Sequence, residues 1–321
     1  VDRLSVSFGG NLAVDRAAVG MHVEHVHEDA ELQRLALEKG ILGALNRHHQ
    51  PVGRRPHRRR IGRNFTRLVA ENLQHDEGDQ PARQRPPPAR DTVLPNARCT
   101  APYGTAPHAH EGRRTPSRLD AKRSIRPGLS TYNGKKINSA NDLVFARDGA
   151  LWFTDPPFGP MNMDPSPPLD QPFAAVYRYA KGKLTPMVTD LKLPNGLGFS
   201  PDGKIFYVNS YGPEMFTRAY DVGPGGKLSN PRIFFTYDHG MGRGGPDGLK
   251  VDMNGNVWST GPGGIRIITP QGKVLGLIKL PEVAANIGFG GPGYRDLYIT
   301  ASTSVYRIHL KVAGEAPLYR R

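Results

Sequence analysis

The sequence predicts an all-β protein, a β-propeller of about four recognisable blades that follows a largely irregular N-terminal region. Two observations predict this class. One unit, made of a short apolar strand, a glycine turn and a second strand with an aromatic residue, is written four times after residue 130. The composition agrees, because 38 Gly and 30 Pro among 321 residues suit a β protein rich in loops.

The four copies begin at residues 141, 195, 247 and 285, which places them 54, 52 and 38 residues apart, as for four-stranded blades. Further apolar strands at 174–180, 183–190, 264–270 and 273–280 fill the intervals. The turns contain glycine, which supplies the positive φ of tight hairpins, and we expect Asp148, Asp202 and Asn254 in them. The aromatic residues that recur in every copy should belong to the core: Trp152, Tyr207, Trp258 and Tyr298.

A polar residue opens three of the four copies. In a propeller the first strands of the blades line one central channel, so Asn141, Asn195 and Asp247 should meet at its mouth. The fourth copy has Ala285 at this place, followed by an asparagine. A plainer interpretation is that Asn195–Gly196 and the Asp-Gly pair at 247 only turn the chain, because both dipeptides are common in turns. Asp142 either supports the site or caps the start of its strand.

Residues 1–130 differ from residues 131–321, and we place a domain boundary between them. The first part holds 20 Arg and 2 Lys against 14 acidic residues, and it is rich in Pro and His. Its apolar residues follow a helical spacing only over 28–46, where we expect a helix. The remainder, 47–130, should be mostly disordered, because it cannot bury enough apolar surface. Translation in the wrong reading frame is another explanation of this composition.

Composition also bears on partners and compartment. The net charge of +14 comes from an arginine-rich arm that could bind nucleic acid phosphates, but no aromatic interleaving or known binding fold accompanies it, so we do not expect such a partner. The histidines complete no recognisable metal-ligand set. The single Cys99 excludes an internal disulfide. No apolar run is long enough to span a membrane and no signal peptide is visible, which favours the cytoplasm.

Three strings, at residues 132–159, 193–203 and 246–258, resemble the gluconolactonase/regucalcin family of six-bladed propeller lactonases, and its bacterial gluconolactonase branch in particular. The resemblance covers about 129–313. It implies a divalent cation, Ca²⁺ before Zn²⁺, Mg²⁺ or Mn²⁺, with Asn195 and Asp247 as ligands. It further implies that Asp247 is the general base, that Asn141, with Asp142 beside it, binds the substrate, and that the reaction opens a sugar lactone such as gluconolactone to an aldonic acid.

The chain departs from this family in one respect. The glutamate of the family's first blade, which would be a third metal ligand, has no counterpart before residue 130, because Glu71 and Glu77 lie in the wrong sequence context. Two other functions therefore remain open. The chain could be a catalytically inactive propeller fragment or binding scaffold, or it could be an arginine-rich nucleic-acid-binding arm fused to part of a propeller.

Overall fold

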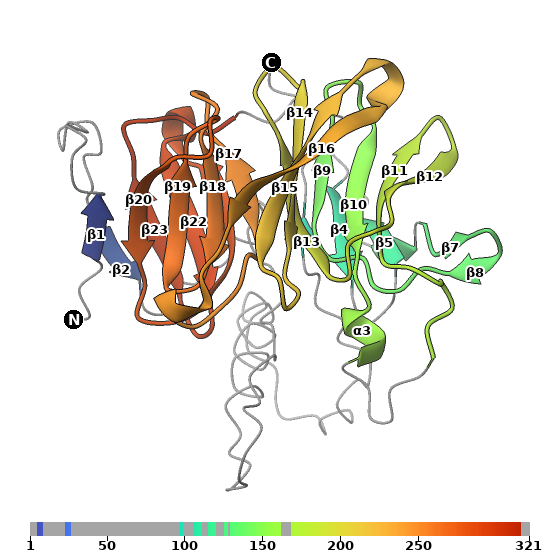
Figure 1. Ribbon diagram of the computed structural model, residues 1–321, viewed down its shortest axis with the longest axis horizontal. Coiled ribbons are helices and arrows are strands. Elements are labelled where there is room, and N and C mark those ends of the chain that lie inside the picture. Colours follow the sequence, from blue (N-terminus) through green and yellow to red (C-terminus); the bar gives the residue numbers. More distant parts are fainter. Residues whose placement is uncertain are drawn as a thin grey trace, which may run out of the picture.

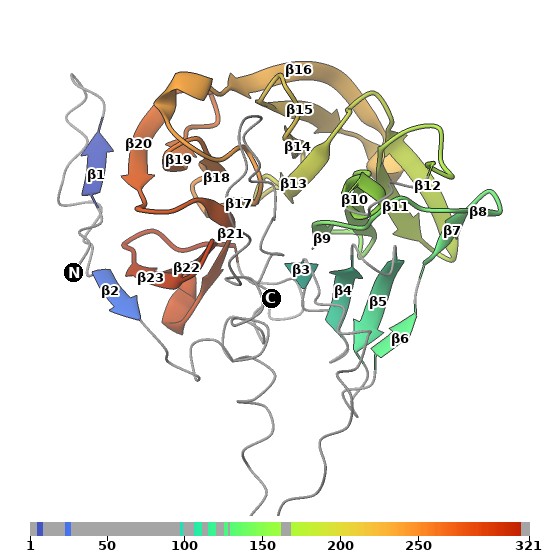
Figure 2. The same cartoon turned by 90° about the horizontal axis from the view of Figure 1, so that it is seen from below.

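The computed structural model describes residues 129–161 and 168–315, together with the backbone of six short strands that precede residue 128. The described strands form antiparallel sheets that stand around a common axis like the blades of a propeller (Figures 1 and 2). The predicted fold class is therefore confirmed. The helix expected at 28–46 and the arginine-rich arm lie outside the described residues.

The first two complete blades correspond to the first two copies of the unit. One blade consists of β9 (Leu143–Phe145), β10 (Leu151–Asp155), β11 (Ala175–Ala180) and β12 (Lys183–Val188), with the short helix α3 (Phe158–Met161) after β10. It is preceded by the hairpin of β7 (Thr131–Tyr132) and β8 (Lys135–Lys136). The next blade consists of β13 (Pro194–Phe199), β14 (Ile205–Ser210), β15 (Phe216–Val222) and β16 (Leu228–Thr236), with the 3-10 turn η1 (Pro224–Gly226) before β16.

The third and fourth copies form the other two blades. The third blade contains β17 (Leu249–Val251), β18 (Val257–Gly261), β19 (Gly264–Ile268) and β20 (Val274–Lys279), and the turn η2 (His239–Met241) precedes it. The fourth blade contains β21 (Ala284–Gly290), β22 (Asp296–Ala301) and β23 (Val305–His309), with η3 (Pro292–Tyr294) between the first two. The strands predicted between the copies are present as β11, β12, β19 and β20.

The strands before residue 128 add to these sheets. β2 (Val23–Val26) pairs with β23 and gives the last blade its fourth strand, and β1 (Ser5–Phe8) pairs with β20. A further four-stranded sheet is formed by β3 (Ala97–Arg98), β4 (Ala106–His110), β5 (Thr115–Leu119) and β6 (Ile125–Pro127). Figure 2 shows this sheet beside the blade of β9 to β12. Residues 97–127 thus hold strands where the sequence indicated mostly irregular chain, while the division of the chain at 130 remains a prediction.

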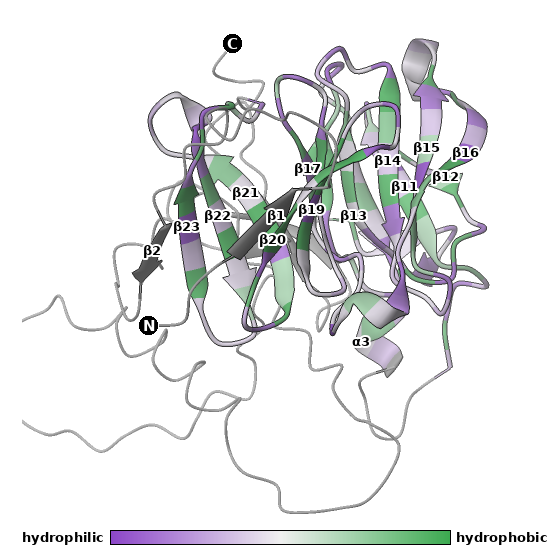
Figure 3. Cartoon of the chain, turned by 60° about the vertical axis from the view of Figure 1, so that its left-hand side comes forward, coloured by the Kyte–Doolittle hydropathy of each residue, from purple (hydrophilic) through white to green (hydrophobic). Residues whose placement is uncertain are grey.

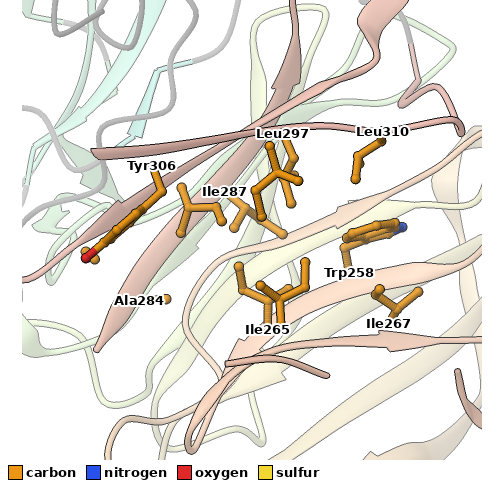
Figure 4. Close-up of a cluster of buried hydrophobic side chains, with 12 residues drawn as sticks. Trp258, Ile265, Ile267, Ala284, Ile287, Leu297, Tyr306 and Leu310 are labelled. Atoms are coloured by element: carbon orange, nitrogen blue, oxygen red, sulfur yellow. The ribbon is translucent and has the colours of Figure 1, made fainter. Parts of the chain in front are cut away.

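The four recurrent aromatic residues are buried, as predicted, and two of them pack against the next blade. Trp152 contacts two rings of the following blade, Phe199 at 5.4 Å and Phe206 at 5.0 Å between centroids. Trp258 meets Phe289 of the last blade at 5.7 Å, and it belongs to the cluster of buried side chains shown in Figure 4. These contacts remove large apolar surfaces from water and join neighbouring blades.

The hairpin turns also match the prediction. Asp148, Asp202 and Asn254 all lie in turns, and the glycine after each has a φ between 74° and 83°. Apolar residues are concentrated on inner strands such as β13 and β21, while β15 and β16 carry more hydrophilic ones (Figure 3). No helix in the described part of the chain is long and apolar enough to cross a membrane.

Candidate active site

Asn195 is the most unusual polar side chain in the described part of the chain. It lies in the innermost strand β13 and is fully buried. Within that part of the chain, neither its Nδ2 nor its Oδ1 has a hydrogen-bond partner. Each buried polar group left without a partner costs about 1–3 kcal/mol, so native folds rarely keep one. The two unused hydrogen-bonding atoms of this buried side chain therefore point to a bound ligand or ion.

Gly196 explains why Asn195 and Asp247 lie side by side. Its N–H donates to the carbonyl oxygen of Asp247 at 2.8 Å. A Cβ atom at position 196 would lie 2.0 Å from that oxygen, so only glycine allows the two backbones to approach this closely. Gly196 is in a strand and has no positive φ. The interpretation of Asn195–Gly196 as a turn is therefore wrong, because the glycine is required by a close contact between blades.

A glycine also allows a close backbone contact between the third blade and the fourth. The N–H of Gly248 donates to the carbonyl oxygen of Ala285 at 2.9 Å. A Cβ atom on Gly248 would lie 2.2 Å from Oδ1 of Asn286. Each of these two glycines thus brings the start of one inner strand against the start of the next, and the polar residues that precede them are carried to the same end of the ring.

The backbone of Asp247 is held on both sides. Its N–H donates to Oγ1 of Thr260 at 3.0 Å, and its carbonyl oxygen accepts from Gly196 and from Nδ2 of Asn209 at 2.9 Å. The residue is 9% exposed and lies directly before β17. Three residues from three strands therefore fix the place from which the carboxylate projects.

Asn141 opens β9 as Asp247 opens β17. It is buried, and its N–H donates to the carbonyl oxygen of Thr154 at 2.9 Å. The segment before it is anchored by the fully buried carboxylate of Asp155, which accepts from the amides of Asn138 at 2.9 Å and Ser139 at 2.6 Å. Since β9 contacts β13, Asn141 is brought close to the strand that contains Asn195.

Asp142 makes contacts within the protein through both of its carboxylate oxygens. Oδ1 accepts from the amide of Leu143 at 2.8 Å, and Oδ2 lies 3.4 Å from the ammonium group of Lys250 on β17. The sequence left two roles open for Asp142, support of the site or a cap at the start of its strand. These contacts favour the cap, and the contact with Lys250 adds a link to another blade. A role for Asp142 in binding substrate remains a prediction.

Tyr211, directly after β14, is a residue that sequence reasoning missed. Burial in the first place, and the negative charge of Asp247 in the second, raise its pKa to about 12, so its hydroxyl keeps its proton at neutral pH. Its ring meets Phe158 edge to face at 6.1 Å, and a Cβ atom on Gly245 would lie 2.7 Å from it. The only sequence signal was an aromatic residue in the loop that follows a copy.

Sequence reasoning also missed a structural position of the repeat, two residues after each core aromatic, which secures the backbone: Thr154, Asn209, Thr260 and Thr300. Their hydrogen bonds reach the residues at the start of the inner strands. The signal was visible in the sequence as a threonine in three copies and an asparagine in one.

Oxygen donors predominate at the site. The carboxylate of Asp247 and the unsatisfied amide oxygen of Asn195 are the type of ligand that a hard divalent cation prefers, so these residues fit such an ion. No group of three or more His, Cys, Asp and Glu side chains with the geometry of a metal site was found among the described residues. Glu71 and Glu77 lie outside the residues that the structure describes.

Comparisons with known proteins identify the family of the chain. A family model described as "SMP-30/Gluconolactonase/LRE-like region" matches residues 109–303, and so begins upstream of the segment in which the sequence resemblance was seen. A gluconolactonase from Zymomonas mobilis is 37% identical over 196 residues, which make up 58% of this chain and 54% of that protein. A regucalcin from Danio rerio is 37% identical over 150 residues, covering 45% of this chain and 49% of its own length. The chain thus spans about half the length of the curated relatives it matches.

Solved structures give the same indication. A gluconolactonase from Xanthomonas campestris superposes with a TM-score of 0.63 at 33% identity, over 68% of this chain and 73% of that one. A calcium-binding protein, regucalcin, from Agrobacterium tumefaciens superposes with a TM-score of 0.57 over 72% of this chain and 81% of that one. Its identity of 20% supports the fold alone.

Proposed function

The chain belongs to the SMP-30/gluconolactonase/LRE-like family, and from this premise we propose that it is an enzyme that hydrolyses sugar lactones to aldonic acids. The observation that carries the proposal is the buried amide of Asn195, which has no partner within the described chain and lies next to Asp247. An unsatisfied amide beside a carboxylate, at the start of the inner strands, is an arrangement prepared for a ligand. The curated lactonases and the solved gluconolactonase among its relatives support the choice of substrate.

The ligand set suits a divalent cation, with Ca²⁺ as the first candidate and Zn²⁺, Mg²⁺ and Mn²⁺ as alternatives. Oδ1 of Asn195 and the carboxylate of Asp247 would hold it. When bound there, the cation would supply Lewis-acid chemistry, which polarises a lactone carbonyl and makes water more acidic.

The chain's own residues would carry the proton transfer. The Asp247 carboxylate would take a proton from the attacking water, while the oxygen atom of that water bonds to the lactone carbonyl carbon. The ring C–O bond would then break, and the proton would pass to the departing ring oxygen, which becomes the hydroxyl of the open acid. Asn141 would orient the substrate, and the protonated hydroxyl of Tyr211 could donate a hydrogen bond to it.

The proposal is tested by titrating the acid released from glucono-δ-lactone in a pH-stat, with Ca²⁺ or Zn²⁺ added and with spontaneous hydrolysis subtracted. Asp247→Asn should lower kcat by about 10² to 10⁴, the usual contribution of a general base. Asp190→Asn serves as the matched control, because Asp190 is an exposed carboxylate whose partner is Arg218 on the outside of a blade.

Equal rates for the Asp247→Asn variant and the parent protein would reject the assignment of Asp247. A parent protein that adds nothing to spontaneous hydrolysis with any of the four cations would instead favour the second function, a binding scaffold without catalysis. What favours that alternative is that Asp247 is the only carboxylate among the four strand-starting residues, since Asn141, Asn195 and Ala285 occupy the other places.

A further inference from the structure

One place in the repeat separates the second copy from the other three. Two residues after each core aromatic, the chain has a threonine in three copies and Asn209 in the second. Each threonine Oγ1 accepts a hydrogen bond from an amide at the start of its own blade: Thr154 from Asp142 at 3.0 Å, Thr260 from Asp247 at 3.0 Å and Thr300 from Asn286 at 3.1 Å. The usual task of this place is therefore to secure the inner strand of the same blade.

Asn209 bonds to the next blade instead. Its Nδ2 donates to the carbonyl oxygen of Asp247 at 2.9 Å and to Oγ of Ser259 at 2.9 Å, and both acceptors belong to the third blade. The side chains of Asn209 and Ser259 are fully buried. Hydrogen bonds between buried groups are costly to break, because the separated donor and acceptor cannot bond to water instead.

A hydrogen bond to Oδ1 fixes the orientation of the Asn209 amide. Its Oδ1 accepts from the hydroxyl of Thr217 at 2.7 Å, and Oγ1 of Thr217 lies 3.0 Å from the hydroxyl oxygen of Tyr237. The hydroxyl of Ser259 donates to the carbonyl of Thr260, so toward Asn209 it can only accept. A hydroxyl donor on one side and two oxygen acceptors on the other leave the amide a single orientation, in which Nδ2 faces Asp247.

We propose that Asn209 is a positioning residue for Asp247, so that one blade sets the place of the carboxylate on the next. The bond reaches the carbonyl of Asp247 and not its carboxylate, so Asn209 acts on the reaction only through Asp247. This inference rests on the proposed function, in which Asp247 holds the cation and accepts the proton. Partners that orient a metal ligand in this way usually change metal affinity or activity about 10- to 100-fold when they are removed.

The chain itself supplies a conservative variant. Asn209→Thr places at position 209 the residue that three other copies have there, so the second blade should still fold, while the donor to Asp247 is lost. Thr300→Val is the matched control, because it removes the hydroxyl that accepts from Asn286 in the last blade and has no bond to Asp247. Both variants are made in the full chain, and their urea denaturation is compared with that of the parent protein.

The first measurement is hydrogen exchange of the backbone around residues 245–250, which depends on neither cation nor substrate. Asn209→Thr should raise the exchange rate there, and Thr300→Val should not. Unchanged exchange in Asn209→Thr would overturn the proposal. So would the same increase in Thr300→Val, because a general loosening of the ring would then explain it.

The second measurement is function. Asn209→Thr should weaken Ca²⁺ binding in calorimetry and lower kcat for glucono-δ-lactone, each about 10- to 100-fold, with little change in KM. Thr300→Val should retain both values. An Asn209→Thr variant that keeps the parent's Ca²⁺ affinity and kcat overturns the proposal. If exchange rises as expected but the parent protein neither binds Ca²⁺ nor hydrolyses lactone, Asn209 is shown to position Asp247 and it is the proposed function that fails.

Discussion

The inner hairpins of the second and third blades are built on the same pattern but are secured differently. Leu197 pairs with Val208 in one and Leu249 with Ser259 in the other, so the two can be compared residue by residue. In the third blade, Thr260 closes the hairpin on itself through the amide of Asp247. In the second blade, the register shifts between Pro194 and Leu197, and the side chain at the corresponding place bonds to the neighbouring blade.

The difference falls at the residues of the candidate site. In the third blade, the residue at this place bonds to the hairpin of its own blade. In the second blade it bonds to the neighbouring blade, and the buried amide of Asn195 has no partner in the described chain. Local rules of a fold are commonly broken at functional positions. The departure of one copy from the other three is therefore as informative as the repeat itself.

The largest effect is expected where the two hairpins touch. A Cβ atom on Gly196 would lie 2.0 Å from a backbone oxygen, whereas one on Gly198 would lie 2.9 Å from Cδ2 of Leu249, the end of a flexible side chain. Gly196→Ala should reduce the free energy of unfolding by about 3 kcal/mol or more, and Gly198→Ala by about 1 kcal/mol. Urea denaturation measures both. Equal losses would mean that the contact between the hairpins is not tight.

A smaller effect should separate two tryptophans at the same place of the repeat. Nε1 of Trp258 donates to the buried carboxylate of Asp252 at 2.9 Å, while the buried Nε1 of Trp152 has no partner in the described chain. Trp→Phe removes a bond to a charged group in the first case and an unsatisfied donor in the second. The variant at 258 should therefore lose about 2 kcal/mol more free energy of unfolding than the variant at 152. A greater loss at 152 would contradict this.

The smallest effect concerns the hairpin turns. The hydroxyl of Ser200 and then the amide of Lys204 bond to the carboxylate of Asp202 and lower its pKa below 3.8, while the third hairpin has Asn254 at this place. A carboxyl whose pKa is lower in the folded state stabilises the fold above its unfolded value and loses this contribution as the pH falls through its folded value. Asp202→Asn should thus be slightly less stable than the parent protein at pH 7, and the difference should shrink below pH 3.8. A constant difference across this range would assign the effect to something other than the charge.

Much of the fold could be predicted because each copy of the repeat corresponds to the inner hairpin of one blade. Alternating apolar strands and glycine turns located the inner hairpins, and the recurrent aromatics located the contacts between blades, as Trp152 and Trp258 show. The strands at 97–127 were missed for a physical reason. Segments such as β4 (APHAH) and β6 (IRP) are held in a sheet by backbone pairing, but they are short, contain proline and show no alternation of apolar and polar residues that would predict a strand.

The candidate site was only partly predictable. The recurrence of a polar residue at the start of a strand made Asn195 and Asp247 candidates, but the reason for the glycines that follow them could not be predicted. A close contact between two backbones is a property of the assembled ring, and Asn-Gly in a sequence looks the same whether it turns the chain or admits a neighbour. Asn209 was overlooked for a related reason, because its bond joins residues 38 apart in the chain.

The pairing of β2 with β23 has a consequence for the order of events during synthesis. Val23 lies opposite Ile308, and Ser5 lies opposite Lys279, so β1 and β2 are synthesised more than 250 residues before the strands with which they pair. Contacts between such distant parts of a chain slow folding and leave strand edges open in the meantime. Until these pairs form, β20 and β23 keep open edges that can pair with other chains.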